Sequence, residues 1–453
     1  MTELSVAHRM ALAALVESCP DRVLPHLSRA VATMPGDRAA VLADMIAVEV
    51  RDRTRRSFAF APLLPLFRPR RDGVAALNFP RPVLPRLWKA ASSREPALLA
   101  RLDEDTPDQT LVADRICVAA AAAVRDQADG VWPPAVSPET REAGLSELAA
   151  CFDLAHLARR DLGVLDAWVA RPDPDQIAEL RLLLRDAAEV APDGAVRMVE
   201  ILFSHIDDAV LVARLATQAS NSAGRGAFLS QSELSVFIDR LVEGLSTRAA
   251  RIAAYRPPGA PGEVEAFLAD VAWCASTIGE MDLTVRPSSD SAWGAATRDA
   301  RSRIGGQLSG LVKSSRKVVE KALPMTRMAL TGRMTRLAPR LDAPVDGDAA
   351  GAAHALAAIL GGLRGPAAVF GFESDRTRMV ETLTEYIFTH ADQGLELINA
   401  GLAADEAAAL ALLEMDADLL GLIDAVDAAR TIRRRIGVAG GVAPRDAESR
   451  SAA

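Results

Sequence analysis

Apolar side chains recur at helical spacing through most of the chain. Residues 4–18 and 37–50 carry an apolar residue every three or four positions, and Pro20 and Pro35 interrupt the pattern. After residue 89 the same spacing returns, and it predicts helices over 106–126, 138–170, 174–191, 195–219 and 231–254. The short breaks between these segments are typical of neighbouring antiparallel helices.

Several of the predicted helices begin with a recognisable start pattern. A capping side chain precedes a proline at Thr106–Pro107, Ser137–Pro138 and Asp173–Pro174, and proline is favoured at the first helical position. Ser230 and Glu233 have the spacing of a capping box. The sequence therefore predicts an all-α fold of many helices. No repeat of fixed length has shared positions, so both an irregular helical bundle and a HEAT-like α-solenoid remain open.

The composition agrees with helices. Half of the residues are apolar and 25% are charged, but only 4% are aromatic, whereas sheets enrich aromatic and β-branched residues. The four cysteines are far apart and form no CxxC pair, which disfavours a zinc site or a disulfide framework and favours a reducing cytoplasm. No run reaches about 18 uncharged apolar residues, and Glu3 argues against a secretory signal. We therefore expect a cytoplasmic protein, including one held peripherally at a membrane.

The stretch 51–89 differs from its surroundings. It carries ten Lys/Arg against two Asp, a formal charge of +8, in a chain whose net charge is −8. It also contains five of the 19 aromatic residues and six prolines, which forbid one continuous helix. We call it the connector and expect it to be an irregular, apolar and cationic segment between helices. The alternative is a loop that fills a gap between helices, with its arginines capping helix C-termini.

Charge changes again near the C-terminus. Residues 298–340 have a formal charge of +9, and residues 341–427 have −13. The basic part contains an amphipathic helix that ends at Pro324, with apolar side chains on one face and lysines on the other. Its cationic face fits a solvated surface, a membrane surface or an anion-binding surface, and the acidic region could also neutralise it internally.

These changes suggest four segments. Residues 1–89 hold N-terminal helices and the connector, 90–256 a central helical array, and 257–440 a C-terminal helical region. The turn at 255–262, rich in proline and glycine, favours a boundary there. Residues 441–453 read as a disordered tail.

Candidate catalytic groups are few. His205 lies beside Asp207 and Asp208, but no second Glu-x-x-His element accompanies them, as a helical metal site would need. Cys151 and His156 are five residues apart, as are Glu385 and His390, so neither pair shares a helix face. No P-loop, GxSxG or complete GxGxxG motif is present. The sequence predicts no catalytic residue, no metal and no cofactor.

The leading interpretation is a non-enzymatic helical scaffold or adaptor that binds a protein partner through cationic surfaces with apolar edges. The residues expected to contact the partner, or an anionic surface, are Arg55, Arg56, Phe58, Phe60, Phe67, Arg70, Arg71, Lys313, Arg316, Lys317 and Lys321. The alternative is a peripheral membrane protein that uses the same elements on anionic lipid. Nucleic acid is disfavoured by a pI near 5.5 and the absence of a recognition signature, and an enzyme of unrecognised helical type is the third reading.

Overall fold

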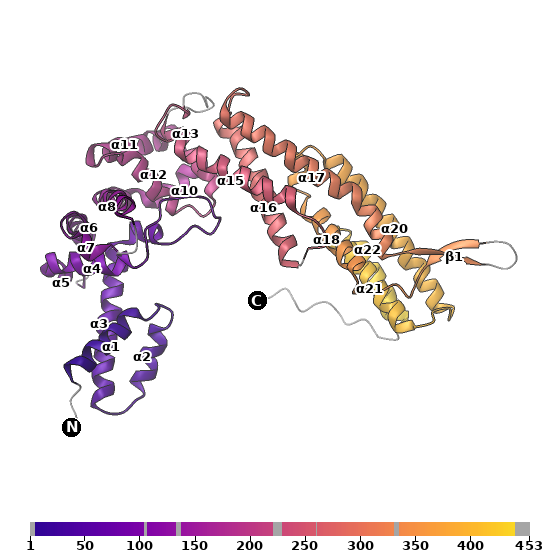
Figure 1. Ribbon diagram of the computed structural model, residues 1–453, viewed down its shortest axis with the longest axis horizontal. Coiled ribbons are helices and arrows are strands. Elements are labelled where there is room, and N and C mark those ends of the chain that lie inside the picture. Colours follow the sequence, from indigo (N-terminus) through magenta and orange to yellow (C-terminus); the bar gives the residue numbers. More distant parts are fainter. Residues whose placement is uncertain are drawn as a thin grey trace. The chain divides into compact units, whose positions relative to one another are not determined.

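The computed structural model describes residues 5–103, 107–132, 137–220, 229–259, 261–329 and 335–439. Within these ranges the regular secondary structure is helical apart from one two-stranded hairpin (Figure 1). The predicted all-α, multi-helix fold is confirmed, and the solenoid alternative stays a prediction.

The chain divides into two compact units. The first comprises Met1–Ala223 and Phe228–Phe237, and the second comprises Gly224–Ala227 and Ile238–Ala453. The predicted finer division, with segments 1–89, 90–256 and 257–440, stays a prediction, and 441–453 lies outside the described residues.

The first unit is an array of short and medium helices. Its elements are α1 (Val6–Ser18), α2 (Leu24–Ala32), α3 (Asp37–Ala59), η1 (Ala61–Phe67), α4 (Val83–Arg94), α5 (Pro96–Arg101), α6 (Gln109–Asp126), α7 (Ala128–Val131), α8 (Pro138–Asp153), α9 (Ala155–Asp161), η2 (Leu162–Val164), α10 (Leu165–Val169), α11 (Pro174–Val190), α12 (Gly194–Ser204), η3 (Ala209–Leu211) and α13 (Val212–Ala219). The capping box at Asp173 and Gln176 is present and starts α11. The predicted helices 138–170 and 195–219 are each broken into shorter ones.

The connector is more ordered than predicted. Its first residues continue α3 to Ala59, because no proline interrupts the helix before Pro62. After Phe60, the seven residues Ala61–Phe67 form the 3₁₀ helix η1, with prolines at positions 62 and 65. An irregular stretch then leads to α4, which begins at Val83.

The second unit consists mainly of long helices. Its elements are α15 (Ser235–Ala254, from Ile238 onward), α16 (Pro261–Glu280), the π-helical turn η4 (Met281–Val285), α17 (Ala292–Ala322), β1 (Met325–Ala329), β2 (Thr335–Pro339), α18 (Asp348–Gly362), α19 (Pro366–Val369), α20 (Glu373–Asn399), α21 (Glu406–Leu422) and α22 (Val426–Ala439). The basic amphipathic helix is α17. It buries its apolar stripe, including Ile304, Leu308 and Val319, in the core of this unit.

The hairpin was not predicted. β1 and β2 pair antiparallel from Met325 opposite Pro339 to Ala329 opposite Thr335. Pro324 ends the helical region because it lacks an N–H for the helix, and the chain continues as a strand from the next residue. The segment is too short to show the alternation that would have indicated a strand.

Candidate functional site

The aromatic residues of the connector belong mainly to the core of the first unit. Phe60 is fully buried and packs edge-to-face against Trp88 and Phe152, with ring centroids 5.4 and 4.7 Å apart. Phe67 is 2% exposed and packs against Phe79. The expectation that Phe60 and Phe67 could anchor a partner is therefore wrong, because both are covered by this chain. The gap-filling alternative describes them correctly.

Phe58 differs from these two rings. It is 39% exposed, and the Arg159 guanidinium lies 6.0 Å from its ring centroid. Arg159 also donates to the Phe58 backbone carbonyl at 3.1 Å and forms an ion pair with Asp114. Phe58 thus remains at the surface at the C-terminal end of α3.

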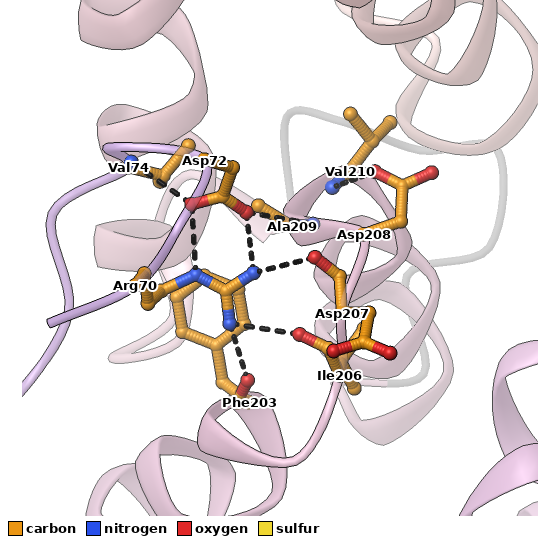
Figure 2. Close-up of polar contacts among 9 residues, drawn as sticks. All are labelled: Arg70, Asp72, Val74, Phe203, Ile206, Asp207, Asp208, Ala209 and Val210. Atoms are coloured by element: carbon orange, nitrogen blue, oxygen red, sulfur yellow. Dashed lines mark hydrogen bonds and ion pairs between the residues drawn. The ribbon is translucent and has the colours of Figure 1, made fainter. Parts of the chain in front are cut away.

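Arg70 is a clamp inside the first unit rather than a free cation (Figure 2). Its Nη1 donates to the carbonyls of Phe203 at 2.7 Å and Ile206 at 2.9 Å, and its Nη2 donates to the Asp207 carbonyl at 3.2 Å. Asp72 forms an ion pair with the same guanidinium, which also lies 4.1 Å from the Phe203 ring centroid. Arg70 therefore ties the connector to the C-terminal end of α12, as the helix-capping alternative predicted.

Arg55 is also neutralised within the chain. It forms ion pairs with Asp103 and with Asp52, the latter at 3.2 Å. The hydrogen bond from Arg55 is the main cause that lowers the pKa of Asp103. Neither Arg55 nor Arg70 is free to steer a partner. The structure therefore contradicts the prediction that these two arginines contact a partner.

Several other arginines of the connector line one cavity of about 920 Å³ in the first unit, which we call the arginine cavity. Five arginines line it, namely Arg53, Arg56, Arg68, Arg71 and Arg81. Arg53 is held by Asp21 and Glu49, both at 2.6 Å. The other four form no ion pair or side-chain hydrogen bond with the described residues.

Arg56 lies deepest among these four, because its side chain is partly buried while Arg68, Arg71 and Arg81 are exposed. Burial lowers the pKa of Arg56, and the nearby charge of Arg53 lowers it further. Arg56 also lines a neighbouring cavity of about 280 Å³, which contains Lys89 and the buried, unpartnered hydroxyl of Ser92. An anion in the arginine cavity would reduce the repulsion between Arg53 and Arg56, which three nearby carboxylates already offset in part.

Apolar side chains form much of the remaining wall of the arginine cavity. They include Leu64, Phe67, Pro69, Pro82, Leu84 and Pro85. The prolines restrict the backbone that carries these side chains, since each proline fixes its own φ angle. The sequence pattern predicts Arg56 and Arg71 as contact residues but does not single out Arg53, Arg68 and Arg81. These three arginines stand in the same basic stretch, but sequence spacing does not reveal which ones find an acid.

A second cavity in this unit, of about 600 Å³, has a different character. Each of its arginines has a carboxylate partner, in the pairs Arg125–Asp153, Arg141–Asp129 and Arg197–Glu147. Its charges therefore satisfy one another, and the arginine cavity is the better candidate for an external anion.

The catalytic candidates do not assemble. The His205 ring nitrogen Nε2 lies 2.8 Å from the Pro62 carbonyl, and burial lowers the pKa of this imidazole. Asp207 and Asp208 are exposed, and Asp208 caps the turn that begins η3. Burial raises the pKa of the Cys151 thiol, which lies in the core, whereas His156 is exposed. Within the described ranges, no three His, Cys, Asp or Glu side chains converge to hold a metal ion.

The cationic face of α17 is exposed as predicted. Lys313, Lys317 and Lys321 are exposed and form no ion pair with the described residues, while Arg316 pairs with Glu320 at 2.7 Å. Among the described residues, ion pairs between the basic and acidic regions are limited to the hairpin and its end, where Arg336 meets Glu396 and Arg340 meets Asp342. The acidic region therefore does not neutralise the lysines of α17.

A buried His–Asp pair in the second unit was not predicted. His390 on α20 and Asp416 on α21 are both fully buried, and His390 Nδ1 lies 2.9 Å from Asp416 Oδ2. The second ring nitrogen of His390 and the second carboxyl oxygen of Asp416 have no partner among the described residues. Burial raises the pKa of Asp416 to about 6.

No helix in the described part of the chain has both the length and the apolar character needed to cross a bilayer. No protein-family model, curated protein or solved structure matches the chain.

Replacing Arg70 by alanine should open the segment 203–210, because three backbone carbonyls lose this donor and the part-buried Asp72 loses its ion pair. Leaving buried acceptors without a donor costs about 1–3 kcal/mol, and native-state hydrogen exchange should report a loss of about that size in 203–210. Arg68→Ala is the matched control, since Arg68 is exposed and unpaired. Equal protection in the two variants would contradict the clamp.

Asp416→Asn should reduce the pH dependence of stability. The pKa of Asp416 is raised from about 3.9 in an unfolded chain to about 6. The protonated carboxyl therefore favours folding at low pH, and that contribution is lost as the pH rises through about 6. Between pH 4.5 and 7.5, wild type should lose about 1–3 kcal/mol more unfolding free energy than Asp416→Asn in urea denaturation. Asp418→Asn, at an exposed site on the same helix, should behave like wild type.

Proposed function

We propose that the chain is a non-enzymatic helical adaptor, and that it binds an acidic segment of a partner protein in the arginine cavity. One observation carries this proposal. Arg56, Arg68, Arg71 and Arg81 line one concave site without an acid of their own, although neighbouring arginines in the same stretch are paired.

Charge and shape both support a carboxylate-bearing or otherwise anionic ligand. Guanidinium groups bind planar anions through two parallel hydrogen bonds, and a partly buried one gains more from this contact than an exposed one. The apolar wall offers area for the side chains that flank the acid. The cavity thus combines the cationic and apolar features that an adaptor surface needs, in a recess rather than on protruding phenylalanines.

A fluorescein-labelled hexaglutamate peptide provides a direct test. Fluorescence anisotropy should detect binding to the full chain at low salt, with weaker binding as salt rises. Changing Arg68, Arg71 and Arg81 to Glu should weaken binding at least tenfold, because each charged hydrogen bond contributes about 1.5–3 kcal/mol.

The matched control changes Arg115, Arg171 and Arg185 to Glu. These arginines lie in the same unit, are exposed and have no ion pair among the described residues. The control variant has the same net charge as the test variant and should keep most of the affinity. Equal losses in the two variants would show a general charge effect and contradict the proposed site.

The lysine row of α17 favours a second candidate function, binding to anionic lipid. Lys313, Lys317 and Lys321 are four residues apart and project from one face, spaced about 6 Å along the helix axis. The nearby hairpin exposes Leu337. Exposed cations next to an apolar side chain suit a headgroup surface.

Vesicle flotation separates this candidate from the adaptor. Wild type should float with vesicles containing 30% phosphatidylserine, and changing Lys313, Lys317 and Lys321 to Glu should abolish flotation, since each lysine contributes about 1 kcal/mol near the surface. Flotation that survives this change would remove α17 as the lipid-binding element.

A further inference from the structure

The ligand class of the arginine cavity can be narrowed from its charges. Three carboxylates, Glu17, Asp21 and Glu49, line it together with the five arginines, which leaves a formal charge of +2. Asp21 and Glu49 are held by Arg53, so Glu17 is the one lining carboxylate without such a partner among the described residues. A single carboxylate from a ligand would leave the cavity positive, whereas a dianion would balance it.

The type of cation in the cavity also favours a dianionic ligand. All five cations that line the cavity are arginines, and the neighbouring Lys89 lines the smaller cavity instead. A guanidinium presents its donors in a fixed planar fork, which matches the oxygens of a phosphate or a carboxylate. A phosphate monoester carries three strong acceptor oxygens and a charge near −2 at neutral pH, so it can accept from several arginines at once. A carboxylate has two oxygens in one plane.

The arginines that line the cavity differ in how far they are exposed to solvent. Arg56 is partly buried beside Arg53, while Arg68, Arg71 and Arg81 are exposed at the connector. A compact dianion could meet Arg56 inside and the exposed arginines at the same time. The apolar wall around Leu64 and Pro82 would then contact the rest of the ligand.

We propose that the arginine cavity recognises a phosphate monoester on the partner segment, that is, a phosphorylated side chain. This inference rests on the proposed function and specifies the acid that the site selects. A phosphorylated segment can enter a recess of about 920 Å³, whereas a flat bilayer presents its headgroups in a plane. The site therefore favours a phosphorylated protein segment over a lipid headgroup.

The discriminating probes are phenyl phosphate and benzenesulfonate. They share one ring and three terminal oxygens, but phenyl phosphate gains its second negative charge near pH 6, while benzenesulfonate keeps a single charge. Isothermal titration calorimetry of the full chain at pH 7.5 should give at least tenfold tighter binding of phenyl phosphate. Its affinity should fall severalfold or more at pH 5.0, and that of benzenesulfonate should change less.

Both probes meet the same titratable side chains of the site. They are Glu17 on α1, Cys19 and Asp21 in the turn after it, and Glu49 on α3, beside the five arginines. Their protonation acts on both ligands, so the difference between the probes isolates the charge of the phosphate.

Two variants test the role of Arg56. Arg56→Lys keeps the charge but removes the planar fork, and it should lose at least fivefold in affinity for phenyl phosphate. Arg115→Lys, at an exposed site in the same unit, should leave the affinity unchanged. Circular dichroism spectra that match wild type would show that both variants fold.

Equal affinities for the two probes at pH 7.5, or an unchanged affinity for phenyl phosphate between pH 5.0 and 7.5, would overturn the phosphate assignment. Hexaglutamate binding that still depends on Arg68, Arg71 and Arg81 would then leave the proposed function standing. Absence of binding by all three probes would overturn both. A lipid ligand is tested with vesicles that contain phosphatidic acid. If the chain floats with them and this flotation is lost on changing Arg68, Arg71 and Arg81 to Glu, the cavity binds a membrane, and the proposal of a phosphorylated protein segment is overturned.

Discussion

A guanidinium group is costly to withdraw from water without an acceptor, and six arginines of the connector show two responses to this constraint. Arg55 and Arg70 find carboxylates and carbonyls within the chain, and they hold the connector against neighbouring elements. Among the described residues, Arg56, Arg68, Arg71 and Arg81 have no such acceptor; they line the arginine cavity, and the last three remain exposed to solvent. The same stretch thus supplies both the attachment of the connector and its candidate binding site.

The buried aromatic residues hold the connector in place, so its arginines have fixed attachment points. Phe60 and Phe67 are buried against other rings of the first unit, which fixes the path of the connector through the prolines of η1. Hydrophobic burial therefore positions the backbone, and the long arginine side chains reach either an internal acid or the cavity. The chain itself thus orders the backbone around the cavity, which would lower the ordering cost of binding a ligand there.

The second unit handles charge differently. α17 buries its apolar stripe and leaves three lysines in solvent, where hydration makes an unpaired charge inexpensive. His390 and Asp416 instead share a buried position between α20 and α21, where one contact joins Nδ1 of His390 to Oδ2 of Asp416. The unit therefore contains an exposed cationic face and a buried polar pair, and we expect the buried pair to make the stability of the unit depend on pH.

Much of the fold could be read from local sequence. Helical spacing and capping residues determined the all-α class, the start of α11 at Asp173 and the amphipathic character of α17, because these depend on residues within a few turns of one another. The hairpin at 325–339 was missed because its strands are short. Which cations remain free was decided by tertiary structure alone: Arg55 meets Asp103, and Arg70 meets carbonyls more than 130 residues away. Ion pairing depends on distances in space, and a charge count along the chain carries no information about them.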